Sequence, residues 1–192
     1  MLLKYLFLGI FVKSVASFDD TITNIPIIAS VAKTRKAKIF FSLGNLLAII
    51  LAIILAIFFS TVLQLVPYYR YVAVGLIFAL AIAVYLDFFV HKPRTIAEKK
   101  VKGCSSVKHC TKIFGVGFIA SFATVLDDII VFAPLLIGSN AIYAVIGILI
   151  ATVIEIIAVI YFSEKIAHVP YKEEIASFGL VTLGILILAG IV

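Results

Sequence analysis

Four aspartates stand in two pairs inside apolar sequence, Asp19 with Asp20 and Asp127 with Asp128. Counted along a helix, each pair lies about 20 Å from the nearest run of basic residues. At the centre of a bilayer an ionised carboxylate costs at least ~2.5 kcal/mol. Asn or Thr would fill a purely structural role at lower cost, so these acids need metal cations, protons or a basic partner to balance them.

Oxygen donors accompany the acids in the sequence. Three polar side chains stand one helical turn from a carboxylate and share its helix face: Thr23, Asn24 and Thr124. A proline follows each pair in a repeated D-D-x5-P pattern, and it either releases a backbone carbonyl as a further ligand or simply kinks the helix. No Cys or His lies inside the predicted spans. The predicted ligands are therefore hard oxygens, which suit calcium, magnesium or manganese and can also hold zinc or cadmium.

Two further ionisable residues lie in apolar sequence. Glu155 is either a proton carrier or metal ligand, or a buried neutral acid. Lys13 precedes Asp20 by seven residues, on the same helix face. It either replaces the cation when the site is empty or extends toward the outer surface. The predicted metal-binding residues are Asp19, Asp20, Asp127, Asp128, Thr23, Asn24, Thr124 and Glu155, and the predicted proton-coupling residues are Asp19, Asp128, Glu155 and Lys13.

The elements that must position these residues are membrane helices. Of the 192 residues, 64% are hydrophobic and 14% are charged, far from the ~45–50% and ~25% of soluble proteins. A spanning helix needs roughly 20 apolar residues, and six stretches qualify: 2–32, 39–63, 71–90, 113–137, 141–162 and 174–192. We therefore predict an all-α integral membrane protein with six transmembrane helices. No Walker or dinucleotide motif occurs, which argues against ATP-driven transport by this chain alone.

The two halves of the chain resemble each other. At a shift of 108 residues the D-D-x5-P pattern recurs and Gly9 aligns with Gly117. At a shift of 103, Gly44 aligns with Gly147, and a Val-Pro-Tyr run recurs. The alternative is chance similarity, although Asp pairs are rare in apolar sequence. Because each half holds three spans, the second half must be inverted, as in many secondary transporters. The predicted organisation is a three-helix repeat over residues 1–90, a basic linker over 91–112 and an inverted three-helix repeat over 113–192.

The net charge of +6 reflects topology rather than nucleic-acid binding, because the basic residues lie in loops between apolar spans. The first, third and fifth loops hold thirteen of the 16 Lys and Arg residues. The positive-inside rule makes these loops cytoplasmic, including the long basic loop, and places both termini outside. The first span begins like a signal peptide, but its apolar pattern continues to Ala32. We expect it to be retained in a multi-pass protein of the cell membrane.

Both cysteines, Cys104 and Cys110, lie in the long basic loop. Reduced thiols are expected on the cytoplasmic side of the membrane. Together with His109 they form either a soft-metal trap or two thiols in a plain loop. Their C-x5-C spacing matches none of the usual zinc motifs.

The run around the second aspartate pair, Ala123-Thr124-Val125-Leu126-Asp127-Asp128-Ile129-Ile130-Val131, resembles the cadmium-resistance transporter family of the lysine exporter (LysE) superfamily. So do the looser copy Ala16-Ser17-Phe18-Asp19-Asp20-Thr21-Ile22, the Thr34-Arg35-Lys36 run, and the Val66-Pro67 and Val74-Gly75-Leu76 patterns. The resemblance covers most of the chain. It implies efflux of divalent metal ions, with the matching aspartates as the metal-binding acids. The superfamily also includes manganese, calcium and amino-acid exporters.

These patterns predict a secondary transporter that exports a divalent cation in exchange for protons. Four Asp and Glu155 carry five negative charges and Lys13 returns one, so one divalent ion leaves two charges for protons or a second ion to balance. The alternatives are export of an amino acid or another small organic cation, and an intramembrane aspartyl enzyme. Symmetric doubling of the acids argues against the enzyme. Expected partners are manganese, calcium, cadmium or zinc, protons and the lipid bilayer, without nucleic acid or another cofactor. The metal, the direction of transport and the oligomeric state are left open by the sequence.

Overall fold

A computed structural model describes residues 2–16, 28, 32, 34–86, 107–126, 128–138, 140–166 and 172–189. Within these residues the protein is helical throughout and contains no strand. The helices are α1 (Leu2–Ala16), α3 (Arg35–Gln64), α4 (Tyr69–Tyr85), α6 (Val107–Thr124), α7 (Asp128–Leu135), α8 (Ala141–Ile166) and α9 (Lys172–Leu188). The all-α class predicted from composition is confirmed for this part of the chain.

Local sequence sets several helix boundaries. Thr34 caps the start of α3, where its hydroxyl accepts a hydrogen bond from the Ala37 amide at 3.2 Å. The turn from α3 to α4 contains Pro67, which has no amide to continue a helix, and Tyr68, whose φ is 61°. Pro134 lies inside α7 near its end, where it withholds an amide from the helical hydrogen-bond pattern. These features limit the helices to the observed lengths.

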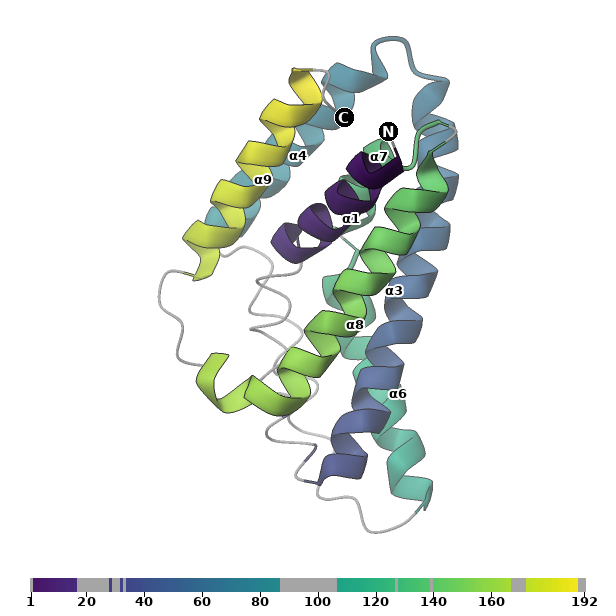
Figure 1. The fold of residues 1–192 in the computed structure, drawn as a ribbon, viewed down its shortest axis with the longest axis vertical. Coiled ribbons are helices and arrows are strands. Elements are labelled where there is room, and N and C mark those ends of the chain that lie inside the picture. The colour runs from purple at the N-terminus through teal and green to yellow at the C-terminus, as the bar shows by residue number, and fades with distance from the viewer. Residues whose placement is uncertain are drawn as a thin grey trace.

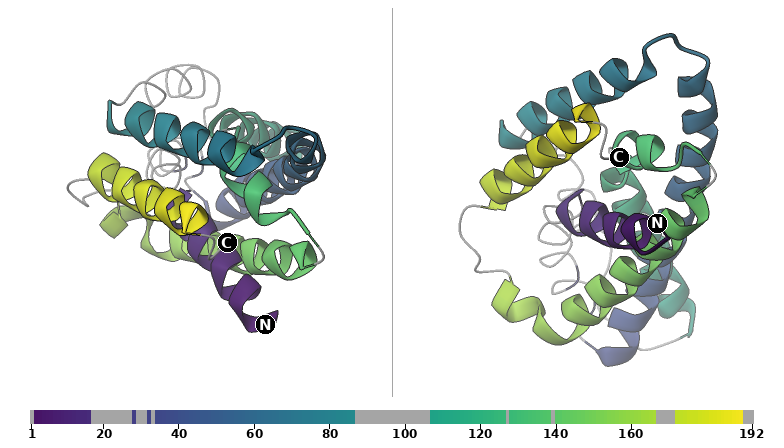
Figure 2. Two further views of the ribbon diagram at one scale, coloured as in Figure 1. Left: turned by 90° about the horizontal axis from the view of Figure 1, so that it is seen from above. Right: turned by 45° about the horizontal axis from the view of Figure 1, so that its top comes forward.

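The helices associate mainly as three pairs (Figure 1, Figure 2). The most extensive contacts join α3 to α6, α1 to α8, and α4 to α9. The short helix α7 contacts α1, α3 and α4. Side chains from all these helices except α6 share one core, which includes Ile49, Ile77, Phe132, Ile148 and Leu183. The core therefore joins the first and second halves of the chain rather than enclosing each half separately.

The α1–α8 pair is in contact at two glycines. A Cβ atom added at Gly9 would collide with the carbonyl oxygen of Ala144, and one added at Gly147 would collide with that of Leu6. Only glycine allows two helix backbones to approach so closely. This contact therefore fixes where α1 and α8 cross.

The α3–α6 pair makes the same contact with different residues. A Cβ atom at Gly117 would collide with the carbonyl oxygen of Phe41, and one at Gly44 would collide with that of Phe114. At the shift of 108, Gly9 and Leu6 of α1 correspond to Gly117 and Phe114 of α6. At the shift of 103, Gly44 and Phe41 of α3 correspond to Gly147 and Ala144 of α8. The two shifts seen in the sequence thus relate the two closest helix contacts atom for atom.

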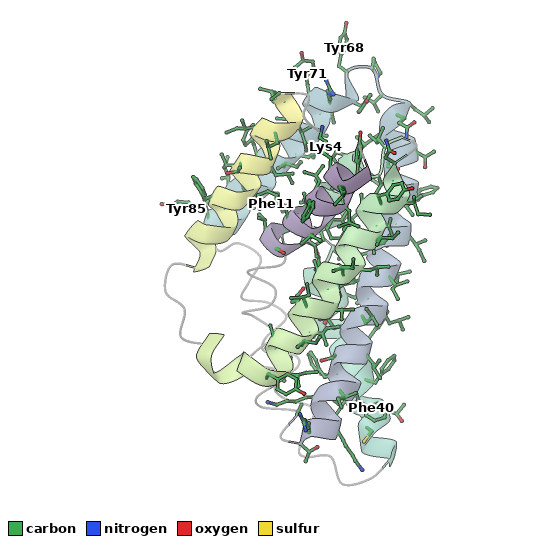
Figure 3. The ribbon with its side chains drawn as sticks, viewed as in Figure 1. Lys4, Phe11, Phe40, Tyr68, Tyr71 and Tyr85 are labelled. Carbon is green, nitrogen blue, oxygen red and sulfur yellow. The ribbon has the colours of Figure 1, made fainter. Side chains whose placement is uncertain are left out.

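The outer faces of the long helices are apolar. Two stretches among the described residues are long and apolar enough to cross a bilayer, Arg35–Gln64 and Ala141–Tyr161, and three shorter apolar helices accompany them. Exposed apolar side chains include Leu43, Leu47, Ile50, Ile54 and Phe58 on α3, and Ile142, Ile146, Val153, Ile154 and Ile157 on α8. Phe11, Phe40 and Tyr85 also project outward (Figure 3). Soluble monomers rarely expose apolar patches larger than a few hundred Å², so this surface is compatible with a membrane protein.

The two ends of the molecule differ in charge. Both termini lie at the upper end in Figure 1, where Lys4, Tyr68 and Tyr71 are labelled in Figure 3. The first turns of α3 and α6 lie at the opposite end, and α8 also ends on that side. Basic residues are concentrated in those three segments: Arg35, Lys36, Lys38, Lys108, Lys112 and Lys165. The helix ends that carry most of the positive charge are therefore remote from the termini.

The fourth predicted span is divided in the structure. The sequence predicts one element over residues 113–137, whereas α6 ends at Thr124 and α7 begins at Asp128, after a turn at Val125 and Leu126. Asp is favoured at a helix start because it faces unpaired amides and the positive end of the helix dipole. A second helix start at Asp128 therefore interrupts the span without any Gly or Pro at the break.

Candidate cation site

Helix α7 begins with an acidic side chain in its first turn, Asp128. That carboxylate is buried, with 1% of the side chain exposed. The first turn of a helix has amides without intrahelical partners and a partial positive charge, both of which favour a carboxylate. Secondary transporters commonly place their ion sites at such interruptions in a spanning helix.

Lys13 reaches this carboxylate from the last turn of α1. Its Nζ donates a hydrogen bond to Oδ2 of Asp128 at 3.1 Å and lies 3.6 Å from Oε2 of Glu155 on α8. The Lys13 side chain is 1% exposed and that of Glu155 is 15% exposed. One ammonium group therefore bridges two carboxylates from two other helices. The interpretation in which Lys13 extends to the outer surface is wrong, because the side chain is 1% exposed and contacts the buried Asp128 and the partly buried Glu155.

Apolar groups surround the bridge. The Phe132 ring, one turn beyond Asp128 on α7, has its centroid 5.9 Å from Nζ of Lys13. Val12 and Ile148 belong to the same core and are fully buried. The hydroxyl of Thr152, one turn before Glu155, donates its proton to the Ile148 carbonyl at 2.8 Å. Charges in such a low-dielectric setting interact far more strongly than charges in water.

The cluster of Lys13, Asp128 and Glu155, here called the buried triad, has an unbalanced charge. When all three groups are ionised, two carboxylates face one ammonium and one negative charge is in excess. Both carboxylate oxygens lie within 4 Å of the same nitrogen, so they are at most about 7 Å apart. A divalent ion in place of the ammonium would neutralise both acids. The arrangement is thus suited to holding a cation between two helices.

The structure brings together three of the four residues predicted for proton coupling, namely Lys13, Asp128 and Glu155. The remaining predicted site residues lie outside the described part of the chain: Asp19, Asp20, Thr23, Asn24 and Asp127. Thr124 is the last residue of α6, but the position of its side chain is not among those described. Convergence of these residues on Asp128 stays a prediction.

No group of three or more His, Cys, Asp or Glu close enough to hold a metal ion occurs among the described residues. Asp128 and Glu155 supply two carboxylates, and a complete coordination shell needs donors from the rest of the predicted set. Of the basic-loop candidates, Cys110 lies half-buried on α6, His109 is on the same helix without a described side chain, and Cys104 lies outside the described residues.

Two features of the site were missed by sequence reasoning. The first is the break before α7, whose only signal is the aspartate pair itself, because Asp favours helix starts. The second is Phe132, which faces the Lys13 ammonium. Its position four residues after Asp128 places both on one helix face, but an aromatic residue in apolar sequence is normally a simple core residue.

A cavity lies at the end of the molecule where the termini are. A cavity of about 160 Å³ lies between α4, α7 and α9, and its lining residues are Tyr69, Arg70, Ala73, Pro134, Ile137 and Ile187. Pro134 is six residues beyond Asp128, or about 9 Å along the helix. The cavity opens where α4 begins and α9 ends, on the side of the termini.

At the opposite end, side chains tie α3 to α8. Nη2 of Arg35 donates a hydrogen bond to the Tyr161 hydroxyl at 2.8 Å, and the guanidinium lies 5.3 Å from the centre of that ring. Below the triad a second apolar cluster includes Phe41, Ile113 and Val159. Among the described residues, α3 and α8 are thus joined at the basic end by one exposed hydrogen bond, with apolar packing between it and the triad.

No protein-family model, no curated protein and no solved structure matches the chain. Function has to be inferred from the residues and geometry of the chain itself.

Proposed function

We propose that this protein is a secondary transporter that exports a divalent metal cation across the cell membrane. The observation that carries the proposal is the buried triad, in which Lys13 Nζ lies 3.1 Å from Asp128 and 3.6 Å from Glu155. Burying three charges costs several kcal/mol per ion, and apolar side chains of similar volume would join the helices at least as well. A cation-binding role explains why the acids are present.

The fold proposed for this role has six transmembrane helices in two inverted repeats. The matching glycine contacts of α1 with α8 and of α3 with α6 support this plan. The interrupted fourth span and the apolar outer faces of α3 and α8 support it as well. In inverted-repeat transporters the substrate binds between the repeats near the midplane. The triad joins α1 of the first repeat to α7 and α8 of the second, which is the location this plan requires.

In the proposed mechanism the metal binds to Asp128 and Glu155, with Asp127, Asp19 and Asp20 as further ligands. Carboxylate oxygens at the positive end of α7 give a hard, rigid site. The cavity beside Pro134 provides the approach from the side of the termini. On the basic side, which is cytoplasmic in this proposal, Arg35 donates a hydrogen bond to Tyr161 and joins α3 to α8. Protons are the proposed counter-ion, because the acids outnumber the charge of one divalent ion.

The resemblance around Asp127 and Asp128 extends this proposal to membership of the cadmium-resistance transporter family. It also agrees with the proposed orientation, in which the basic loops are cytoplasmic and both termini are outside. Which metal the site prefers depends on the number and geometry of all its ligands, not on Asp128 and Glu155 alone.

Flux measurements in proteoliposomes test the proposal. Purified protein is reconstituted with a pH-sensitive dye inside, and manganese, calcium, magnesium, zinc and cadmium are supplied outside. Wild type should carry at least one of these ions together with an opposite movement of protons. Asp128→Asn removes a ligand charge while keeping the side-chain shape, so it should abolish flux. The matched control Asp87→Asn, at a carboxylate outside the predicted site, should retain it. Full flux in Asp128→Asn, or no flux of any of the five ions in wild type, contradicts the proposal.

Export of a small organic ammonium ion is a second candidate function. The specific observation in its favour is the environment of the Lys13 ammonium group, which contacts two carboxylates and lies 5.9 Å from the centre of an aromatic ring. This is a geometry that recognises amines. The same proteoliposomes, supplied with radiolabelled lysine or a short diamine, distinguish the two functions: uptake of the amine without any metal flux favours the second.

A further inference from the structure

We infer that Lys13 is a built-in counter-cation that the transported ion must displace from Asp128 and Glu155, and that its displacement releases the inner end of α1. The inference deepens the proposed function and rests on it. It begins from one fact: the cation that bridges these two acids is the ammonium group of Lys13, which belongs to α1.

The geometry leaves no room for both cations in one place. Nζ of Lys13 lies 3.1 Å from Oδ2 of Asp128 and 3.6 Å from Oε2 of Glu155, so it occupies the space between the two acids. A metal ion needs these oxygens at about 2.0 to 2.6 Å. The metal ion would also repel the ammonium group of Lys13 if both cations lay between the two carboxylates. The lysine stem has four rotatable carbons and can withdraw its charge without unfolding the helix.

The repeat provides an independent observation. The position equivalent to Lys13 is Ser121, and the position equivalent to Glu155 is Ala52. Both are buried, and both lie on the α3–α6 pair, which makes the same glycine contact as α1 with α8. That pair packs without either charge. Lys13 and Glu155 therefore occur together, as an added cation and an added acid beside Asp128.

The helix contacts determine what moves when Lys13 leaves. Gly9 and Gly147 hold α1 against α8, one turn before Lys13 along α1. Beyond this crossing, Lys13 ties α1 to α7 and α8 by polar contacts, and Val12, Val15 and Ala16 add apolar packing. Loss of the polar contacts weakens this attachment, so residues 10–16 should move more easily about the glycine contact.

Equilibrium binding to the full-length protein in lipid nanodiscs tests the displacement, with manganese and cadmium as the probe ions. Lys13→Gln removes the competing charge and should bind at least about tenfold more tightly than wild type, a gain of about 1.4 kcal/mol. The matched control Lys4→Gln makes the same change on the exposed part of α1 and should bind as wild type does. Lys13→Arg keeps the charge and should bind no more tightly than wild type.

The second readout is hydrogen exchange of the wild-type amides. If Lys13 had a purely structural role, adding metal would not accelerate exchange in α1. Adding manganese or cadmium should accelerate exchange in residues 10–16 and leave residues 2–9 unchanged. If wild type binds neither ion, the proposed function itself fails. If wild type binds but Lys13→Gln binds no more tightly, the displacement is overturned and the transport proposal stands. If Lys13→Gln does not fold, exchange in wild type decides: acceleration supports the inference, and unchanged or slower exchange overturns it.

Discussion

Stability at the buried triad should depend on how many charges are left unbalanced. Lys13→Gln leaves the carboxylates of Asp128 and Glu155 at most about 7 Å apart and without the ammonium group that bridges them. Asp128→Asn leaves Lys13 with Glu155 at 3.6 Å, and Glu155→Gln leaves Lys13 with Asp128 at 3.1 Å. Each of the two acid variants therefore retains one neutral pair. The lysine variant retains none.

The expected magnitudes follow from these distances. Two like charges at most about 7 Å apart repel by at least ~2 kcal/mol at an effective dielectric constant near 20, and removal of one partner from a buried pair costs ~3–5 kcal/mol. Lys13→Gln should therefore lower the free energy of unfolding by ~3–5 kcal/mol. Asp128→Asn and Glu155→Gln should each change it by less than ~1.5 kcal/mol, because the excess negative charge disappears with the acid. For a chain of 192 residues, 1 kcal/mol corresponds to roughly 2–4 °C in Tm.

Far-ultraviolet circular dichroism is the suitable assay, since the protein is helical and contains no Trp. Melting curves are recorded with a chelator present. Lys13→Gln should melt roughly 6–20 °C below wild type. The double variant Lys13→Gln with Asp128→Asn should recover part of that loss, because one of the two facing acids is gone. If Asp128→Asn destabilises the protein as much as Lys13→Gln does, the triad is an ordinary structural ion pair and the charge-balance reasoning is refuted.

Three further measurements test the packing, the orientation and the ligand. Gly9→Ala should destabilise the protein by ~1–3 kcal/mol, because the added Cβ collides with the α8 backbone. The control Gly75→Ala, with nothing within 4 Å of the added Cβ, should be neutral or stabilising by ~0.5–1 kcal/mol. Equal melting temperatures for the two variants would contradict the close crossing. Cys110 should resist a membrane-impermeant maleimide in intact cells and react after lysis, and labelling without lysis would reverse the orientation. The transported metal should stabilise wild type by about 2.7 kcal/mol at one hundred times Kd, and no increment with any divalent ion would argue against a metal site.

The helical fold could be predicted because it depends on local properties of the sequence. Long apolar runs with few breakers require helices in a bilayer, and α3 and α8 coincide closely with the stretches 39–63 and 141–162. Lys13, Asp128 and Glu155 could each be singled out for the same kind of reason, since an ionisable group in apolar sequence is costly wherever it lies. These inferences need no knowledge of distant contacts.

The partners of those charges could not be predicted. Helical periodicity shows which residues share a face of one helix, and on that basis Lys13 was associated with Asp20, its neighbour seven residues along the chain. Its observed partner Asp128 lies 115 residues away. That pairing depends on how α1, α7 and α8 cross, and the crossing is set by Gly9 and Gly147, whose role emerges only when the two helices are seen together.

Comparison of the two halves separates what the packing requires from what a ligand requires. The glycines of the α1–α8 crossing have glycine counterparts in the α3–α6 crossing, and both pairs contact equivalent backbone atoms. If Lys13 and Glu155 served only to hold helices together, the same packing would require charges at Ser121 and Ala52, yet those positions are neutral and buried. The packing is thus satisfied without charge in one half. The helix crossing therefore does not explain the charges in the other half, whereas the proposed displacement of Lys13 by a bound cation would account for them.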